Sequence, residues 1–263
     1  MSGFDLFGNP IADITRPTQC LMGSGSVIDL IAPKADDLNL LQDLPTGLAR
    51  LNRFSGQTAG APYSVAQHCV IGADALLAET GDARLAALFL LHDAHEYVMG
   101  DITRPVTMAL KSYGIAMLHR VLTDPRKPDD GAGTGQLREA LTRAMGQLKA
   151  SLDGAIFAAA KTPLPSPQEA AIIKEMDDRM LAVELKQLFP YRPANWHEIE
   201  GKKPVRLSTK LKPWPWVRAE DEYRAALQRF CPAVTHTTLQ KMRDFNGNVG
   251  GSLADEASTQ TFT

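Results

Sequence analysis

The 263-residue sequence has little cysteine, little net charge and no long hydrophobic run. Its three cysteines, Cys20, Cys69 and Cys231, are far apart and show no CxxC spacing, which is typical of reduced thiols in a cytoplasmic protein. The formal net charge of −2 gives no electrostatic footprint for a nucleic-acid polymer or a membrane surface. No stretch approaches the roughly 20 apolar residues of a membrane-spanning helix, and the first residues do not form a secretory signal. We therefore expect a cytoplasmic protein whose partners include neither a nucleic-acid polymer nor a membrane.

Strand-like alternation is also scarce, and no internal repeat is evident, whereas helical periodicity is common. Hydrophobic residues make up 44% of the chain, which is enough for a substantial core. The length fits one large domain, or a core domain with appendages. The sequence therefore predicts an all-α protein.

Capping and breaking residues place the expected helices. Ser64 is a suitable N-cap, Gly81 and Gly100 are suitable helix ends, and Ser166 followed by Glu169 has the spacing of a capping box. The segment ARLAALFLLHDAHEYV is apolar almost all round, so we expect it to form one helix at the centre of the fold. The expected helices cover about residues 38–52 (interrupted at Pro45), 64–79, 83–98, 136–161, 166–188 and 217–231.

Two segments have the composition of loops. Residues 123–135, TDPRKPDDGAGTG, are rich in proline, glycine and aspartate and predict a surface loop. Residues 189–215 are rich in proline and tryptophan and predict a loop or a hairpin. The three tryptophans, Trp196, Trp214 and Trp216, fit core or interface positions better than base stacking. Neither His119 nor His197 has a partner pattern, so we expect both at the surface.

The segment LLHDAHEYVMGD, residues 90–101, places two histidines, two aspartates and a glutamate at the end of an apolar run. Burying so many ionisable groups is costly unless each charge is compensated. A divalent cation would compensate them, and imidazole and carboxylate ligands suit Mn, Co, Fe, Ni or Zn. His92 and Asp93 are too few to hold an ion. His68 lies 24 residues earlier, and Asp177 lies within an apolar helical pattern.

Each of these additional candidates has a simpler interpretation. His68 could be a hydrogen-bonded helix histidine, and Asp177 could pair with Arg179 or Lys174. The neighbouring Asp178 is placed more laterally on the same helical pattern and suits a solvated position or one that contacts a metal ligand.

The series His68, His92, Asp93 and Asp177 resembles the H…HD…D signature of the HD superfamily of metal-dependent phosphohydrolases. Three blocks, YSVAQHCVIGA, HDAHEYVMGDITRPV and IKEMDDRMLAVE, look like those of the bacterial 5′-deoxynucleotidase branch and its phage-encoded relatives, which include dATP triphosphohydrolases. The segment SVIDLIAPKADDLNLLQDLPTGLARLNRF is similar to the N-terminal block of the phage proteins.

The resemblance implies a division of the chain. Residues 25–190 would form an HD-domain helical bundle, with an insertion at about 123–147. Residues 1–24 would be an N-terminal extension, residues 191–244 a helical or irregular C-terminal appendage, and residues 245–263 a flexible tail.

The resemblance also implies roles for individual residues. His68, His92, Asp93 and Asp177 would bind a divalent ion, which could be Mn, Co, Mg, Zn, Fe or Ni. Glu96 and Asp101 would orient or deprotonate the attacking water, a role that suits carboxylates within hydrogen-bond reach of it.

Further residues are expected to bind the substrate. Arg53 falls where the family has an arginine that contacts phosphate, and Phe54 falls where the deoxynucleotidases often have tryptophan. Because Phe54 departs from that pattern, base selection stays open. Lys111 is a further cation for the phosphate end, as are Arg104 and Lys174. His95 is either a packed histidine or a substrate contact.

The predicted activity is hydrolysis of phosphate esters of (deoxy)nucleotides, and two reactions stay open. One releases phosphate from a 5′-monophosphate, and the other releases triphosphate from a deoxynucleoside triphosphate. A non-catalytic nucleotide-binding regulator is the alternative from another class, but such a module does not need the pair Glu96 and Asp101. The family is commonly homo-oligomeric, so we expect a homo-oligomer.

Overall fold

The computed structural model describes residues 18–122, 132–191 and 201–234. These residues form eight α-helices and one small antiparallel hairpin, so the predicted all-α class is confirmed. The elements are β1 (Gln19–Leu21), β2 (Val27–Asp29), α1 (Asp43–Arg50), α2 (Val65–Thr80), α3 (Ala83–Leu91), α4 (Glu96–Met99), α5 (Arg104–Leu122), α6 (Ala132–Ala159), α7 (Pro167–Leu188) and α8 (Trp216–Phe230). In the hairpin, Gln19 pairs with Asp29.

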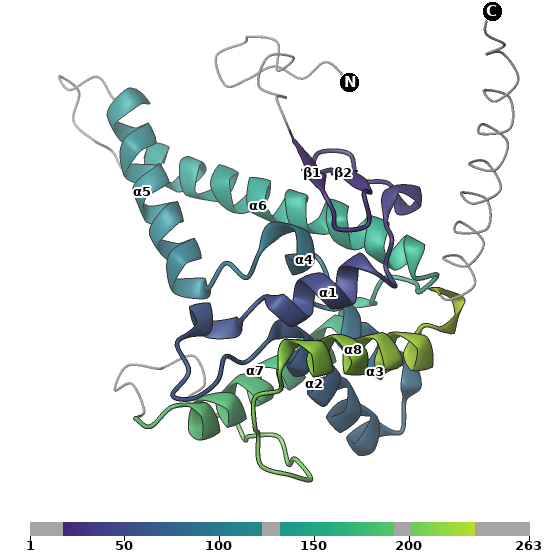
Figure 1. Ribbon diagram of the computed structural model, residues 1–263. Coiled ribbons are helices and arrows are strands. Elements are labelled where there is room, and N and C mark those ends of the chain that lie inside the picture. The colour runs from purple at the N-terminus through teal and green to yellow at the C-terminus, as the bar shows by residue number, and fades with distance from the viewer. Residues whose placement is uncertain (1–17, 123–131, 192–200, 235–263) are drawn as a thin grey trace, which may run out of the picture.

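Helices α2 and α3 form the centre of the molecule, and α1, α7 and α8 pack around them (Figure 1). The last four residues of α3, Leu88 to Leu91, are completely buried, as its apolar sequence predicts. The Tyr223 hydroxyl on α8 donates a hydrogen bond to the Leu90 carbonyl at 2.8 Å. Helix α8 therefore shares the core of the preceding helices.

Side chains at the helix ends explain where α2, α3 and α7 begin. The Ser64 hydroxyl accepts a hydrogen bond from the Gln67 amide at 3.2 Å, and Ser166 and Glu169 form the predicted capping box. Gly81 ends α2 with a φ of 69°, in the left-handed region that favours glycine. The Asp82 carboxylate then caps α3. The expected boundaries of these helices are confirmed at these positions.

The expectation of one continuous helix over residues 83–98 is wrong. Helix α3 ends at Leu91, a turn covers residues 92–95, and α4 begins at Glu96. Within the turn, the amides of His92 and Glu96 donate to carbonyls three residues earlier rather than four. The His92 ring also lies against the Phe89 carbonyl, with Nδ1 2.6 Å from the oxygen. Hydrophobic periodicity gives no sign of a hydrogen bond between a backbone carbonyl and a side chain, such as this one.

The expected helix over residues 38–52 is also wrong in its extent. Helix α1 covers only Asp43–Arg50, and Pro45 lies in its first turn instead of interrupting it. Proline suits that turn because the first amides of a helix need no partner within the helix. Phe54 and Ser55 follow in a short turn with φ values of 57° and 52°.

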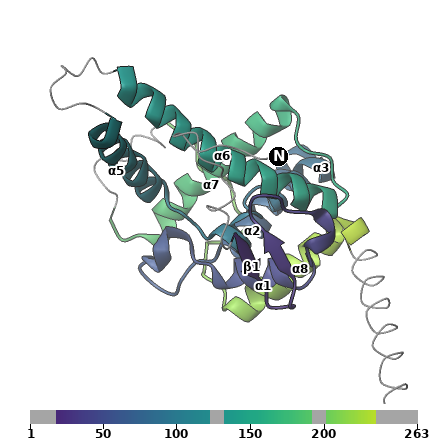
Figure 2. The same ribbon diagram turned by 90° about the horizontal axis from the view of Figure 1, so that it is seen from above.

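Helix α6 begins at Ala132, so residues 132–135 are helical and not part of the predicted loop. The rest of that loop, Trp196, His197 and the predicted tail lie outside the described residues, as does the side chain of His119. Helix α5 and the start of α6 extend away from the other helices in both views (Figures 1 and 2). Among the described helices, none has both the length and the apolar character that crossing a membrane would require.

Candidate metal centre

The four side chains expected to bind a metal come together from three parts of the chain. His68 is on α2, His92 and Asp93 are in the turn after α3, and Asp177 is on α7. His68 Nε2 lies 3.4 Å from Asp177 Oδ1 and 3.9 Å from Asp93 Oδ2. His92 Nε2 lies 3.0 Å from Asp93 Oδ2 and 3.9 Å from Asp177 Oδ1.

These separations suit ligands of a single ion. Ligand atoms about 2.1 Å from one cation lie about 3.0 Å apart at a right angle and about 3.4 Å apart at the tetrahedral angle. The ligand atoms of His68, His92 and Asp93 all lie within 4.8 Å of one another. This group could therefore hold a metal ion.

The hydrogen bonds of the two histidines leave one nitrogen of each ring facing the cluster. His68 Nδ1 lies 2.6 Å from Glu184 Oε1, and His92 Nδ1 lies 2.6 Å from the Phe89 carbonyl. Carboxylate and carbonyl oxygens accept hydrogen bonds, so a neutral ring in either position carries its proton on Nδ1. Both Nε2 atoms are buried and have no hydrogen-bond partner among the residues that the structure describes. A divalent cation satisfies both lone pairs, so these residues fit a metal.

The charges around the cluster also favour a cation. Asp93 Oδ2, Asp177 Oδ1 and Glu184 Oε2 lie 3.5, 4.0 and 3.2 Å from nitrogen atoms of the Arg53 guanidinium. When both histidine rings are neutral, one positive charge thus faces three carboxylates in a site that is largely closed to water. Buried charge of one sign is costly unless it is balanced, and a divalent ion would balance it.

The carboxylates of the cluster favour the protonated form of both histidines. Burial lowers the pKa of His92, but the carboxylates of Asp93 and Asp177 outweigh burial and raise this pKa well above its usual value. The pKa of His68 is also raised, since Glu184 and Asp177 outweigh burial and the Arg53 charge. Burial alone would raise the pKa of Asp93, but His92 holds it below its usual range. An incoming cation must therefore displace protons from the rings.

Glu96 and Asp101 adjoin the cluster as a second acidic group. One Glu96 oxygen is buried and has no hydrogen-bond partner in the described parts of the chain. A ligand-type atom of Glu96 lies within 4.8 Å of one of Asp93. Burial and the nearby carboxylates of Asp93 and Asp101 raise the pKa of Glu96 to about 9. Burial likewise raises the pKa of Asp101. Carboxyl groups with raised pKa values could exchange a proton beside the cluster.

Arg53 faces the cluster, whereas the other residues that are expected to bind the substrate differ in how they are placed relative to it. The Phe54 ring packs edge-on against Phe189, with centroids 5.1 Å apart, and lies beside the Arg53 guanidinium. His95 is buried, and its Nδ1 lies 3.1 Å from Asp153 Oδ1 of α6. Lys111 is on α5, and no ion pair among the described residues joins it to the cluster.

The structure confirms one of the two simpler interpretations of Asp177, its pairing with Lys174. Lys174 Nζ lies 3.8 Å from Asp177 Oδ2 and also pairs with Asp178. Asp178 turns to Lys174 and Lys202, as its lateral position predicts. Arg179 pairs with Glu79 rather than with Asp177.

Sequence reasoning missed Glu184, which is completely buried and contacts both His68 and Arg53. Glu184 is seven residues after Asp177 on α7, so both lie on one face of the helix. The sequence features that could have identified Glu184 are this spacing and the presence of a charged residue in an apolar helical pattern.

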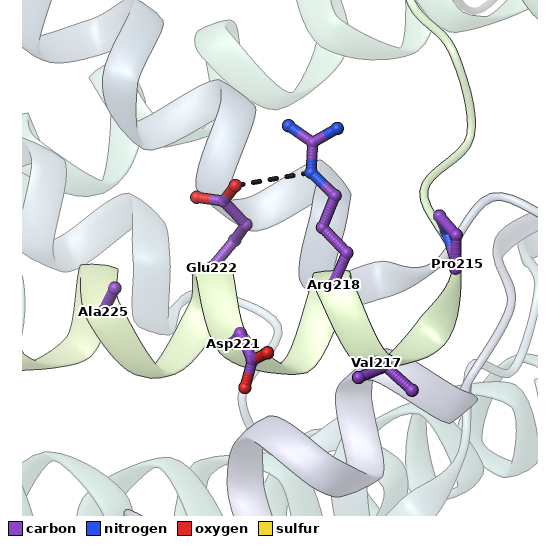
Figure 3. Close-up of a pocket in the computed structure, with 6 residues that line it drawn as sticks. All are labelled: Pro215, Val217, Arg218, Asp221, Glu222 and Ala225. Carbon is purple, nitrogen blue, oxygen red and sulfur yellow. Dashed lines mark hydrogen bonds and ion pairs between the residues drawn. The ribbon is translucent and has the colours of Figure 1, made fainter.

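Two surface hollows lie beside the proline- and tryptophan-rich segment, and no residue of the cluster lines either one. The first, about 570 Å³, follows the outer side of α8, where Arg218 donates to Glu222 at 3.4 Å (Figure 3). The second, about 560 Å³, lies between Trp214, Trp216 and the end of α1. The guanidinium of Arg50 stacks on Trp216, and that of Arg218 stacks on Trp214, each at 4.7 Å. Neither hollow therefore belongs to the candidate site.

No family model matches the chain. It is similar to an uncharacterized protein of Rhodobacter capsulatus, with 34% identity over 208 residues. The matched region covers 75% of this chain and 89% of the relative.

Proposed function

The chain belongs to the family of the Rhodobacter capsulatus protein, and we propose that it is a metal-dependent phosphohydrolase of the HD type that acts on (deoxy)nucleotides. The observation that carries this proposal concerns the Nε2 atoms of His68 and His92. Both are buried next to the carboxylates of Asp177 and Asp93, and neither has a hydrogen-bond partner among the described residues. The order of the sequence blocks and the all-α fold support the same assignment.

The residues divide into a metal-binding set and a set that acts on the substrate. His68, His92, Asp93 and Asp177 would hold the ion. A divalent ion bound there supplies a Lewis acid for a phosphoryl oxygen and lowers the pKa of water.

Arg53 is suited to bind the phosphate. Its Nε donates to Glu184, which leaves the two terminal nitrogens directed toward the cluster. A guanidinium held in this way can donate two charge-assisted hydrogen bonds to one phosphate. Phe54 follows directly and can cover the sugar or the base.

Glu96 and Asp101 are suited to handle the proton of the attacking water. Hydrolysis needs a nucleophile at neutral pH, and a carboxylate within hydrogen-bond reach of water can orient it and accept its proton. Glu96 has a buried oxygen free for this contact. Burial and the neighbouring carboxylates raise the pKa of Glu96, and a cation bound beside Asp93 would lower it by offsetting the negative charge that Glu96 faces.

Within this proposal we favour 5′-deoxynucleotidase activity, in which a deoxynucleoside monophosphate gives a deoxynucleoside and phosphate. Release of triphosphate from a deoxynucleoside triphosphate, such as dATP, is the alternative reaction, since the same site could act on a different phosphate. A regulator that binds nucleotides without hydrolysing them is the alternative of another class.

One experiment separates the three functions. The purified protein is incubated with Mn²⁺ or Co²⁺ and a panel of mono- and triphosphates, and the products are separated chromatographically. Orthophosphate from monophosphates supports the nucleotidase, and intact triphosphate supports the alternative reaction. Nucleotide binding without any product supports the regulator. His92→Ala is the control, because it removes a proposed ligand.

We also propose that the protein forms a homo-oligomer. Helix α5 and the residues before it expose large apolar side chains, which is typical of contact surfaces. They are Ile102, Val106, Met108, Leu110 and Tyr113. Light scattering of the purified protein tests the proposal: Met108→Glu is expected to lower the measured mass toward that of one chain, and a monomeric wild-type protein would refute it.

A further inference from the structure

Glu184 on α7 is completely buried, and each of its two oxygens contacts a different residue of the candidate site. Oε1 lies 2.6 Å from His68 Nδ1, and Oε2 lies 3.2 Å from Arg53 Nε. We propose that Glu184 is a positioning residue that fixes both the tautomer of His68 for metal binding and the orientation of Arg53 for phosphate binding. This inference rests on the proposed function of the site.

The contact with His68 determines which ring nitrogen is available to a metal. An ionised carboxylate only accepts hydrogen bonds, so the neutral ring must carry its proton on Nδ1. Nε2 is then unprotonated, and it lies 3.4 Å from Asp177 Oδ1. Histidine ligands commonly donate their second nitrogen to a carboxylate or a carbonyl, which fixes the ring. His92 has a carbonyl partner, Phe89, that a side-chain substitution does not remove.

The contact with Arg53 fixes the other end of the site. Nε of the guanidinium donates to Glu184, and the terminal nitrogens lie 3.5 Å from Asp93 and 4.0 Å from Asp177. A guanidinium has donors only. Both of these contacts therefore call for an acceptor, and the two oxygens of a carboxylate supply one for each.

Glutamine at this position would separate the two contacts. It has the shape of glutamate but one acceptor oxygen and one NH₂ donor. Because Arg53 cannot accept, the oxygen must turn to Arg53 and the NH₂ group to His68. Nδ1 of His68 then becomes an acceptor, the ring proton moves to Nε2, and Nε2 no longer binds a cation.

The test is the affinity of the metal-free, full-length protein for Mn²⁺ and for Co²⁺, measured by calorimetry. Loss of the hydrogen-bond partner of a metal-binding histidine typically weakens binding about 10- to 100-fold, which is the change expected for Glu184→Gln. Glu175→Gln is the matched control, because it makes the same substitution on the same helix at an exposed residue that pairs with Lys202. Wild-type affinity in E184Q would overturn the inference.

Two further measurements distinguish positioning from a general effect on the fold. The visible spectrum of bound Co²⁺ is expected to change in E184Q, since one nitrogen ligand is lost, whereas looser packing with all ligands intact would leave it unchanged. Glu184→Asp keeps two acceptor oxygens and is expected to bind the ions more tightly than E184Q. The reverse order of affinities would contradict the role of the acceptor oxygens.

If E184Q does not fold, the inference is tested instead by nitrogen-15 NMR of the histidine rings in the Zn²⁺-loaded wild-type protein. His68 is expected to show a protonated Nδ1 and a metal-bound Nε2, and a proton on Nε2 would overturn the inference. These experiments distinguish a failure of this inference from a failure of the proposed function. A wild-type protein that binds no divalent ion refutes the function, whereas a wild-type enzyme with metal and an unaffected E184Q variant refutes only the role of Glu184.

Discussion

Gly72 on α2 and Phe89 on α3 are in direct contact: a Cβ atom on Gly72 would lie 2.1 Å from Cε1 of Phe89. Gly72 is one turn after His68, and Phe89 is one turn before His92. The absence of a side chain at Gly72 therefore lets the two helices approach where their histidines meet, with ring centroids 5.4 Å apart.

We expect Gly72→Ala to destabilise the protein and to weaken metal binding together. The added methyl group must displace the Phe89 ring, and overpacking of this kind typically costs about 1–3 kcal/mol. Thermal unfolding and Mn²⁺ titration measure the two effects. Gly146→Ala on α6 is the control, because its added Cβ meets no atom within 4 Å. A Gly72→Ala variant as stable as the wild-type protein would contradict the close approach.

Replacing Arg53 should separate substrate binding from metal binding. In Arg53→Ala, loss of a charge-assisted phosphate contact should remove about 1.5–3 kcal/mol of transition-state stabilisation. This loss corresponds to a decrease in kcat/KM of roughly 10- to 150-fold. Metal content should be retained, since the four proposed ligands are unchanged. Arg143→Ala, at an exposed arginine that pairs with Glu139 on α6, should have neither effect. Unaltered kinetics in Arg53→Ala would assign phosphate binding to another cation.

Metal affinity should rise with pH. The pKa values of His68 and His92 are raised in the metal-free protein, so both rings hold protons above the pH at which an ordinary histidine loses its proton. A cation competes with these protons, and binding strengthens as pH increases through the raised pKa values. Calorimetric titrations with Mn²⁺ between about pH 6 and pH 8, the range in which a histidine usually titrates, measure the trend. Affinity that is constant or falls over this range would contradict proton displacement.

The same shifts predict the opposite trend for the metal-free fold. A group whose pKa is raised in the folded state stabilises that state fully below its unfolded pKa, and this contribution is lost as pH rises through the folded pKa. For His92 the usual value is 6.5. The contribution of His92 to stability should therefore decline above that pH in the metal-free protein. Urea unfolding with and without the His92→Phe substitution measures it, and a contribution that grows with pH would refute the assignment.

Glu96→Gln and Asp101→Asn should lose rate while retaining the ion. Loss of general acid–base assistance typically costs about 10²- to 10⁴-fold in rate. Metal analysis beside turnover measurements checks this division of roles. If Glu96→Gln also loses the ion, Glu96 is a ligand, and if it keeps full activity, proton transfer belongs to Asp101 or His95.

Local signals made much of the fold predictable from the sequence. Ser64, Gly81 and Ser166 mark helix ends through contacts within a few residues, and the structure has the expected caps at all three. The turn after Leu91 was not predictable in this way, because apolar periodicity continues through it and the His92 ring contacts a backbone carbonyl. The left-handed backbone of Phe54 was also hidden, since neither residue type nor spacing suggests it.

The candidate site was partly predictable for a similar reason. His92 and Asp93 are adjacent, and their position after an apolar run marks them as unusual. His68 and Asp177 were expected through a family resemblance, and the structure brings them to the same place. Glu184 could be identified only from the structure, because the two residues that it contacts are 116 and 131 positions away in the sequence.

Asp177 and Asp178 offer the most direct test of the site, because they are adjacent acids with different surroundings. Asp177 faces His68 and His92, with its other oxygen 3.8 Å from Lys174, whereas Asp178 pairs with both Lys174 and Lys202. The measurement is the metal content of each variant after dialysis against Mn²⁺, beside its rate of product release from the best nucleotide substrate. Asp178→Asn should retain the bound ion and the activity of the wild-type protein, and Asp177→Asn should lose both. Equal metal content and activity in the two variants would contradict a catalytic metal centre at His68, His92, Asp93 and Asp177.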